Sequence, residues 1–570
     1  MLAIFKKHYL ILVLALIVGS LTLLPQLFAV KTLGHDFKGI YHTVGDDERY
    51  YLARGQDIID GHNFLSNPYL FEYKKGSPMQ VWLPDYLMAK PLSVLKIDVV
   101  HGYLFYDFLL TFILTILTYI AVYLLTNHKF YSLAAAATLH LGLFLEEFNR
   151  SPSPQFNFIF WLLLLIFLIK FIQSNKKIYL ILSGLVLGSL FYSYTYYWTF
   201  YFIVLFIFIF LGALAKKNII IFRSYLYLIV GAMVVALPYF ISLYNSSGSP
   251  YYNESLIRLG MLNTHFPSGL KIVAMTVAVL IIFFIAYKRE IIRLGLIELF
   301  LLAGGLAGAV SVNQHVITGK NLEFSSHYLL ESEFWLVIIL FYLLSVFIKK
   351  LENKKAKKYI LGGVIVFVIL ISSFNIFQTV KKQIILRPED AQQQNYAEIL
   401  NWLNDNAPKD SVVFADKNIT EFIPAYTSLN VFFSRNANLF FISNREVEKR
   451  FIINNYWENF SQEFILSSER SIWGTEYINS YNHGLNKNKL RKLFFLPLKN
   501  YVRVPGEEID RVITLAHQMQ KQDFKSLLGD YRVDYLVWDK NVDVNWRVEK
   551  LNFLSSVYEK NNIIIYKIIR

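Results

Sequence analysis

The chain has 570 residues, 55% of them hydrophobic, it contains no cysteine, and its formal net charge at pH 7 is +14. So apolar a composition indicates a membrane protein, and the lack of cysteine excludes disulfides, thiolate metal sites and Cys nucleophiles. The charge does not indicate nucleic acid, because much of it lies in short loops where anionic lipid headgroups are the expected partner and no basic helix or aromatic platform accompanies it.

Hydrophobic runs recur through the first two thirds of the chain. A spanning helix needs about 20 mostly apolar residues, and on that basis the runs predict about eleven spans. The first has a basic start like that of a signal peptide, but its apolar stretch is too long and no small-residue cleavage site follows, so we expect a retained anchor. The predicted spans are 8–30, 101–125, 130–147, 156–173, 178–195, 197–214, 222–243, 270–287, 294–312, 333–350 and 358–378.

Lysine and arginine are concentrated in every second gap between these spans. Basic loops stay in the cytoplasm, so we expect a cytoplasmic N-terminus, and an odd number of spans then places the C-terminus on the outer face. The basic segments are Lys6-Lys7, Lys129, Lys176-Lys177, Lys216-Lys217 with Arg223, Lys288-Arg289 with Arg293, and residues 349–358.

From about residue 385 the sequence has the character of a water-soluble domain. Residues 392–406 predict an amphipathic helix and 445–463 a second helical region, and short apolar runs at 411–415, 535–538 and 563–568 predict buried strands. At roughly 185 residues the segment is large enough for its own core. The sequence therefore predicts a polytopic helical membrane domain (1–384) followed by an extracytoplasmic α/β domain (385–570).

The first long loop, residues 31–100, carries the residues most suited to chemistry. Asp46, Asp47 and Glu48 stand side by side just after the first span. Adjacent carboxylates at a low-dielectric boundary repel one another, so one of them could serve as a base. Acidic residues are also favoured at a solvated helix N-terminus, and this loop alone supports both interpretations equally.

The same loop resembles the first outer loop of the GT-C glycosyltransferases, especially the bacterial lipid A aminoarabinose transferases and the protein O-mannosyltransferases. Those enzymes have an Asp-Glu pair, then an aromatic residue, an Ala/Ser-Arg pair, a Gly and a Lys-containing Pro motif. Gly76 and Ser77 intervene before the proline here, so the lysine match departs from the pattern. The matching residues are Asp47, Glu48, Tyr50 or Tyr51, Ala53, Arg54, Gly61, Lys74, Lys75 and Pro78.

This resemblance implies a GT-C fold and a membrane enzyme of the bacterial plasma (inner) membrane. It would transfer a sugar from a polyprenyl-phosphate-linked donor to a lipid, glycan or protein acceptor on the outer face. Asp47, paired with Glu48, would take the proton of an acceptor hydroxyl, and the lipid phosphate would leave with inversion. Arginine suits a bidentate phosphate contact best. The candidates for binding the donor phosphate are Arg54, Arg150, Lys320 and His327.

Two further gaps between spans contain polar residues that need an explanation. Glu146 and Glu147 follow the end of a predicted helix, where the dipole disfavours them, so a cation, a substrate or a salt bridge to Arg150 could account for them. Related oligosaccharyltransferases use acidic residues of this loop for a divalent metal, but their Trp-Trp-Asp-x-Gly motif is missing here, which argues against N-glycosylation. The remaining candidates for substrate or metal binding are Asp46, Lys74 and His315.

Two other classes of function stay open. A polysaccharide polymerase or ligase would differ mainly in whether the donor carries one sugar or a chain. A transporter for lipid-linked sugars would also have many spans, but we would expect ionisable or Gly/Pro-broken positions deep in the helices and a repeat between the halves. Neither feature stands out in the sequence.

Overall fold

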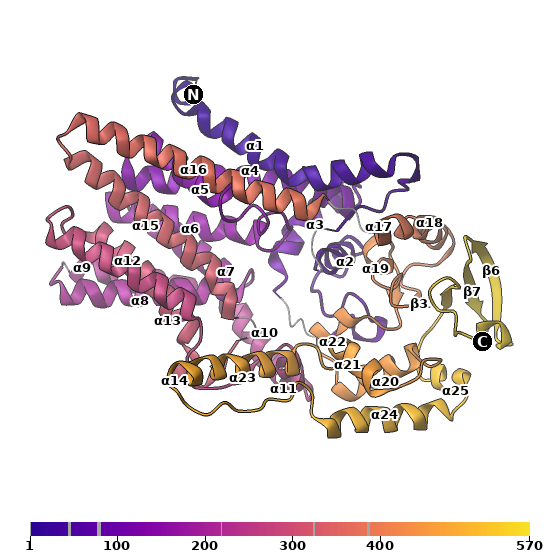
Figure 1. Cartoon of the computed structure of the whole chain (residues 1–570). Helices are drawn as coiled ribbons and strands as arrows, with labels where there is room; N and C mark the ends of the chain where they lie inside the picture. Colours follow the sequence, from indigo (N-terminus) through magenta and orange to yellow (C-terminus); the bar gives the residue numbers. More distant parts are fainter. Residues whose placement is uncertain are drawn as a thin grey trace.

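The computed structural model describes residues 2–43, 47–76, 81–217, 219–322, 325–384 and 388–569. It consists of a bundle of long helices and a mixed α/β domain that lies against one end of the bundle (Figure 1). The prediction of a polytopic helical membrane protein with a C-terminal α/β domain is therefore confirmed.

Among the described residues, eight helical segments are long and apolar enough to cross a membrane. A ninth candidate is the pair α9 (Ile219–Val235) and α10 (Leu237–Ser247), which is bent by 52° where Pro238 interrupts the helix. The eight segments are formed by α1 (Leu2–Leu33), α4 (Val99–Thr126), α6 (Gln155–Ser174), α8 (Thr195–Leu214), α12 (Leu270–Lys288), α13 (Leu296–Asn313), α15 (Tyr328–Lys350) and α16 (Lys354–Gln383).

Two of the eleven predicted spans are too short to cross a membrane as helices. Helix α5 (Lys129–His140) has 12 residues and α7 (Lys177–Leu190) has 14, whereas a full span needs about 20. The apolar sequence continues past His140, but the backbone turns there and is covered by neighbouring helices. The expectation of eleven full-length spans is therefore wrong by this measure.

The core of the bundle is aromatic. Trp161 and Trp335 are buried with their rings 5.8 Å apart, edge to face. The indole of Trp335 donates to the Leu301 carbonyl at 3.0 Å, and a Cβ at Gly304 would lie 1.7 Å from the same ring. Glycine at this position therefore allows α13 and α15 to approach closely enough for the tryptophan to fill the space between them.

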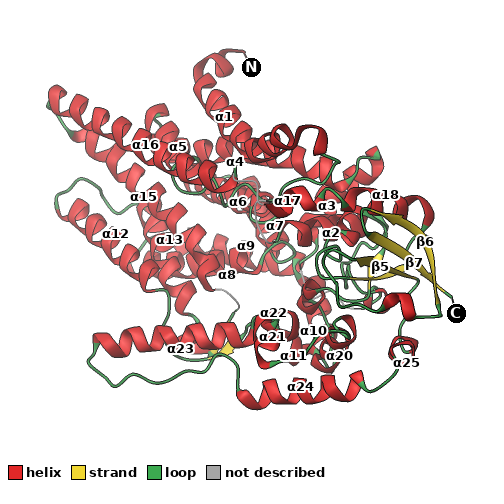
Figure 2. Cartoon of the chain, turned by 45° about the vertical axis from the view of Figure 1, so that its right-hand side comes forward, coloured by secondary structure: helices red, strands yellow, loops and turns green. Residues whose placement is uncertain are grey.

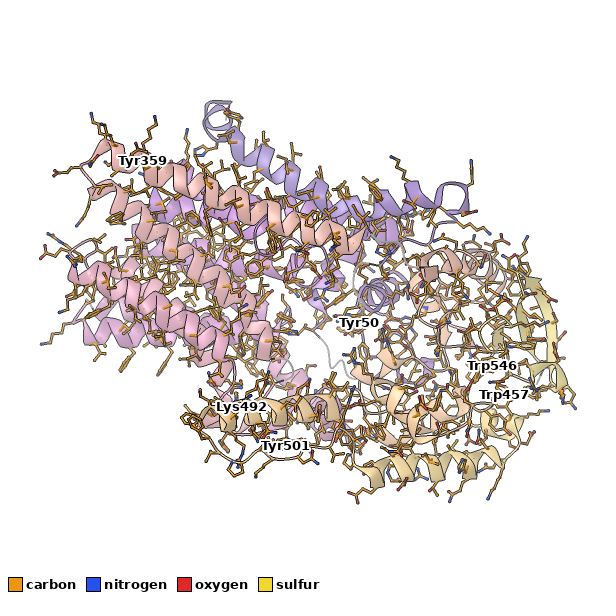
Figure 3. The ribbon with its side chains drawn as sticks, in the orientation of Figure 1. Tyr50, Tyr359, Trp457, Lys492, Tyr501 and Trp546 are labelled. Carbon is orange, nitrogen blue, oxygen red and sulfur yellow. The ribbon has the colours of Figure 1, made fainter. Side chains whose placement is uncertain are left out.

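The first long loop folds against the C-terminal domain. Its helix α2 (Glu48–Ile59) carries Tyr50, which is labelled in Figure 3. Tyr50 belongs to a hydrophobic cluster that also contains Tyr69 and Leu70 of the same loop and Phe440 of the C-terminal domain. The loop is therefore positioned by the C-terminal domain as well as by the membrane helices. Its other elements are η1 (Gly34–Asp36), η2 (Phe71–Tyr73) and α3 (Leu83–Leu95).

The C-terminal domain contains a five-stranded mixed sheet with the order β4-β3-β5-β7-β6, of which β5, β7 and β6 are labelled in Figure 2. Strands β3 (Val412–Ala415), β4 (Asn430–Val431) and β5 (Tyr535–Asp539) run parallel, while β6 (Leu554–Lys560) and β7 (Ile563–Ile568) are antiparallel to their neighbours. The three strands predicted from the sequence are β3, β5 and β7. The predicted amphipathic helix is divided into α17 (Pro388–Gln393) and α18 (Tyr396–Asn406).

Further helices surround this sheet and extend from it. They are α19 (Ile423–Tyr426), η4 (Arg435–Leu439), α20 (Asn444–Asn454), α21 (Gln462–Ser467), α22 (Glu469–Trp473), α23 (Glu476–Leu493), α24 (Gly506–Gln520), α25 (Phe524–Gly529) and η5 (Val548–Lys550). The short elements between membrane helices are α11 (Tyr252–Arg258), β1 (Leu262–Asn263), α14 (His315–Thr318), β2 (Lys320–Asn321) and η3 (Ser325–His327).

Candidate active site

Asp47 stands immediately before α2, where the membrane bundle meets the C-terminal domain. Its side chain makes no capping hydrogen bond to the helix, so a simple N-cap does not account for its position. Instead, one carboxylate oxygen accepts a hydrogen bond from Arg150 at 2.9 Å, across 103 residues of sequence. The carboxylate remains 59% exposed. It is therefore ion-paired and still accessible to a ligand.

Arg150 is held by its own loop and by the first long loop. Its Nε donates to the Ser153 carbonyl at 2.9 Å, and its guanidinium lies 5.8 Å from the centre of the Tyr51 ring. The side chain is 35% exposed. These contacts aim the guanidinium at Asp47 and leave part of it open to a second anion.

His327 belongs to the same cluster, although it comes from a third loop. Its Nδ1 lies 2.6 Å from the Tyr194 hydroxyl, and its ring centre is 4.8 Å from that of Tyr196. Desolvation of the ring and the positive charge of Arg150 together lower the pKa of His327 to about 4. The imidazole is therefore neutral at pH 7, and it could donate a hydrogen bond to a phosphate but would not bring a positive charge.

Arg54 has a different environment from the one expected of a phosphate ligand. Its side chain is 4% exposed and forms a salt bridge with the equally buried Asp85. It also donates to the Tyr50 hydroxyl at 2.9 Å and to the Val81 carbonyl at 2.6 Å. These partners use the guanidinium inside the protein and do not present it to a donor phosphate, so a role of Arg54 in phosphate binding stays a prediction.

The two glutamates of the second predicted loop do not pair with Arg150. Glu146 forms a salt bridge with Lys382 of α16. Burial raises the pKa of Glu147, and the negative charges of Glu146 and Glu333 add to that effect. The structure therefore has a contact between Glu146 and the last membrane helix, and not the salt bridge to Arg150 that was one of the predicted alternatives.

Lys74, His315 and Lys320 lie in other contacts. Lys74 forms a salt bridge with Asp57 of α2, and its side chain is largely buried. His315 is buried, with Nε2 2.8 Å from the Phe266 carbonyl, and Lys320 stands in β2, whose partner is β1. None of these contacts includes Asp47 or Arg150. Asp46 and Pro78 lie outside the described residues.

Within the described ranges, no group of three His, Asp or Glu side chains could hold a metal ion. A divalent cation therefore stays a prediction from the resemblance.

A cavity of about 530 Å³ lies beside this cluster, and the sequence did not reveal it. Its walls come from the first long loop, from α17 and α18, and from the segments that follow β3 and β4. The carboxyl ends of parallel strands are an edge where ligands commonly bind. The sequence signal that could have located this cavity was the polar run Asp416-Lys417-Asn418, which directly follows the predicted strand 411–415. The lining includes Thr43, Arg49, Gln393, Tyr396, Lys417, Asn418, Glu421 and Arg435.

A second, much smaller cavity of about 40 Å³ is lined by Arg150. Glu48 and Arg150 both line it, together with His42 and Asn149, and Thr43 lines both cavities. The large cavity and the Asp47–Arg150 pair are therefore neighbours, separated by a few residues of the first long loop.

No protein-family model and no curated protein matches this chain. Solved structures do resemble it over most of its length. ArnT from Cupriavidus metallidurans in the apo state has a TM-score of 0.46 and 11% identity, covering 99% of this chain and 98% of that chain. The same protein bound to undecaprenyl phosphate has a TM-score of 0.45 and 10% identity, covering 99% and 98%.

The Archaeoglobus fulgidus oligosaccharyltransferase, tethered to an acceptor peptide, has a TM-score of 0.44 and 12% identity, covering 95% of this chain and 70% of that chain. Both proteins are glycosyltransferases of the GT-C class that the first long loop resembles.

Proposed function

We propose that the chain transfers a sugar from a polyprenyl-phosphate-linked donor to an acceptor on the outer face of the membrane, with inversion at the anomeric carbon. The observation that carries this proposal is the Asp47–Arg150 pair: an accessible carboxylate and an accessible guanidinium 2.9 Å apart at the end of a membrane bundle. A transferase of this kind needs a base for the acceptor and a cation for the leaving phosphate.

In the proposed reaction, the acceptor hydroxyl attacks the anomeric carbon and its proton passes to the Asp47 carboxylate. The bond between the anomeric carbon and the phosphate oxygen breaks, and that oxygen leaves with the electron pair as polyprenyl phosphate. Arg150 would bind the donor phosphate in the ground state and compensate the negative charge that grows on it. The phosphate would then compete with Asp47 for the guanidinium and release the carboxylate for proton transfer.

A neutral hydrogen-bond donor would complete the phosphate site. His327 and Tyr194 are hydrogen-bonded to one another. Without adding charge, this pair leaves one donor for a phosphate, either the Nε2–H of His327 when Tyr194 donates to Nδ1 or the hydroxyl of Tyr194 when Nδ1–H donates to it. Glu48 faces the small cavity behind Arg150, which suits it to balance the charge of the guanidinium. Arg54 would hold the shape of α2 and not touch the donor.

The cavity of about 530 Å³ is the proposed acceptor site. Its volume falls within the range of roughly 300–1,000 Å³ that is usual for ligand pockets. Lys417 and Arg435 are exposed cations on its wall, so it would suit an acceptor with both hydroxyl and anionic groups. Such an acceptor would reach the Asp47 carboxylate from the side of the C-terminal domain.

The test uses the full chain reconstituted in proteoliposomes with an undecaprenyl-phosphate-linked radiolabelled sugar and a crude envelope glycolipid extract as acceptor. We expect label to move into the extract with the protein and not with the Asp47→Asn variant. Replacing the lipid-linked donor with a nucleotide sugar should give no transfer. Transfer from the nucleotide sugar, or equal transfer by Asp47→Asn, would refute the proposal.

The outer-face assignment has its own test. Reporter fusions near residue 354 and at the C-terminus should report opposite compartments, because the basic run 349–358 is expected in the cytoplasm. Both reporters on one side would refute the orientation, whatever the transfer assay shows.

A further inference from the structure

Residues 477–506 form a hairpin with a strongly one-sided charge. This segment contains six Lys or Arg residues and no Asp or Glu. It consists of most of α23, a turn, and an extended return segment (Figure 1). Five of the cations, Lys487, Lys489, Lys492, Lys499 and Arg491, lie between the middle of α23 and the return segment. The expectation that no basic helix accompanies the positive charge is therefore wrong for α23.

The hairpin is built by specific contacts and is not a loose loop. Asn488 and Lys499 exchange hydrogen bonds in both directions, at 2.7 and 3.0 Å. Arg491 donates to the Pro497 carbonyl at 2.6 Å. A Cβ at Gly484 would lie 2.6 Å from the Tyr501 ring, so glycine allows the return segment to pack on the helix.

The tip of this hairpin presents large apolar side chains outward. Leu493 is 66% exposed, Phe494 67% and Phe495 97%, and Leu496, Leu498 and Val502 are also at least half exposed. A contiguous apolar patch with a basic rim on a folded domain is typical of an interaction surface. Aromatic and aliphatic residues beside lysines are the composition expected at a membrane interface.

The contacts of α23 place the tip at the level of the membrane boundary. Asn479 bonds to the Gly260 carbonyl, His483 lies 3.0 Å from the Thr264 hydroxyl, and Lys487 lies over the Phe266 ring. Each later residue of α23 in this series contacts a later residue of the segment 260–266. That segment leads into membrane helix α12, which begins at Leu270.

The tip continues in the same direction. From Lys487 to Phe494 the helix adds about 10 Å, so the tip lies beyond the Phe266 contact, in the direction in which the neighbouring segment approaches α12. Exposed apolar side chains of the bundle, Leu270 and Ile317, lie at the same end. Figure 3 shows Lys492 and Tyr501 on this side of the molecule, far from Trp546 at the other end of the domain.

We propose that the hairpin 477–506 docks the C-terminal domain onto the bilayer, with Phe494 and Phe495 inserted at the headgroup boundary and its lysines on anionic lipid headgroups. The positive charge and the continuity with the membrane-embedded helices favour a lipid surface over a protein partner. This docking does not depend on the proposed transfer activity.

The absence of native cysteine allows a clean test. The full chain carrying Phe495→Cys is labelled with an environment-sensitive fluorophore and placed, one copy per disc, in nanodiscs whose lipids bear a quencher near the headgroup. The control is Val544→Cys, which is 64% exposed and lies elsewhere in the C-terminal domain. We expect quenching at position 495 to exceed that at 544 by about threefold or more in discs with anionic lipid.

A second variant tests the charge. In the labelled Phe495→Cys chain, Lys489→Gln, Lys492→Gln and Lys499→Gln together should abolish the difference in quenching between anionic and neutral discs, because these side chains are exposed on the hairpin. An unchanged thermal midpoint shows that the variants fold. Equal lipid quenching at 495 and 544 would overturn the proposal, as would a label at 495 that is shielded from aqueous iodide without being quenched by lipid.

Discussion

Arg54 and Arg150 make the same type of contact, a guanidinium on an aspartate, in two different environments. Arg54 is 4% exposed and its partner Asp85 is 1% exposed. Arg150 is 35% exposed and its partner Asp47 is 59% exposed. The first pair lies inside the fold of the first long loop, and the second lies at the surface where the bundle meets the C-terminal domain.

The degree of burial distinguishes a structural ion pair, Arg54 with Asp85, from one that is available for chemistry, Arg150 with Asp47. A buried pair has already lost its water and cannot exchange its partner without a large penalty. An exposed pair contributes little to stability, and either partner can turn to a ligand at low cost. The resemblance to glycosyltransferases gave both arginines the same role, and their surroundings distinguish them.

The largest expected effect comes from breaking the buried pair. Arg54→Ala would leave Asp85 as an uncompensated buried charge and should lower the free energy of unfolding by about 3–5 kcal/mol. Thermal unfolding of the purified chain measures this loss. The double variant Arg54→Leu with Asp85→Leu should recover much of it. A stable Arg54→Ala protein that fails only in donor binding would return Arg54 to the phosphate site.

The second effect is on activity and not on stability. Asp47→Asn removes the proposed base and should lower the rate of transfer by roughly 10²-fold or more, while the stability changes by less than about 1 kcal/mol because the pair is exposed. Asp36→Asn is the matched control, since Asp36 is an exposed carboxylate of the same loop. Asp46→Asn should do less than Asp47→Asn. A greater loss in Asp46→Asn would move the base one residue upstream.

A smaller effect is expected at the other partner of the exposed pair. Arg150→Ala should raise the KM for the lipid-linked donor by about tenfold, with a smaller change in kcat, because the proposed phosphate contact exists already in the ground state. Arg445→Ala, an exposed arginine of α20, serves as the control. A fall in kcat with unchanged KM would instead assign Arg150 to positioning Asp47.

The sequence allowed some of this arrangement to be predicted, for physical reasons. Asp47 and Arg150 each follow a helix that ends at the same face of the bundle, so alternating basic loops were enough to bring them together. Strands β3, β5 and β7 were readable because buried strands are short apolar runs. The burial of Arg54 was not readable, because it depends on Asp85, 31 residues away, and on the packing of α2 against α3.

The short helices α5 and α7 were missed for a related reason. Hydrophobicity continues after His140 through Leu141 and Leu143, so a composition window cannot detect that the backbone turns there. Irregular backbone at that depth is tolerated where other helices cover it. The cavity was also hidden, because Arg49, Lys417 and Arg435 meet only through the docking of the first long loop on the sheet.

The smallest expected effect is on the pH dependence of stability, and it concerns Asp60, the residue at the C-terminal end of α2. Burial raises the pKa of Asp60 to about 6, although Lys409 and Lys74 oppose the shift. The folded chain therefore holds this proton more tightly than the unfolded chain, whose Asp titrates near pH 4. Its contribution to stability should fall as the pH rises from about 4 to about 6 and stay lower above that range.

Asp60→Asn cannot ionise, so it should remove this fall and leave the protein at pH 7.5 more stable by about 1 kcal/mol or less, since solvent screens a partly exposed group. Thermal midpoints of wild type, Asp60→Asn and Asp36→Asn at pH 4.5, 5.5, 6.5 and 7.5 measure the difference. If wild type and Asp60→Asn show the same slope between pH 4.5 and 6.5, another group controls it. A flattened slope in Asp60→Asn alone would show that α2 carries a destabilising charge at its C-terminal end, in contrast to the stabilising buried pair of Arg54 and Asp85.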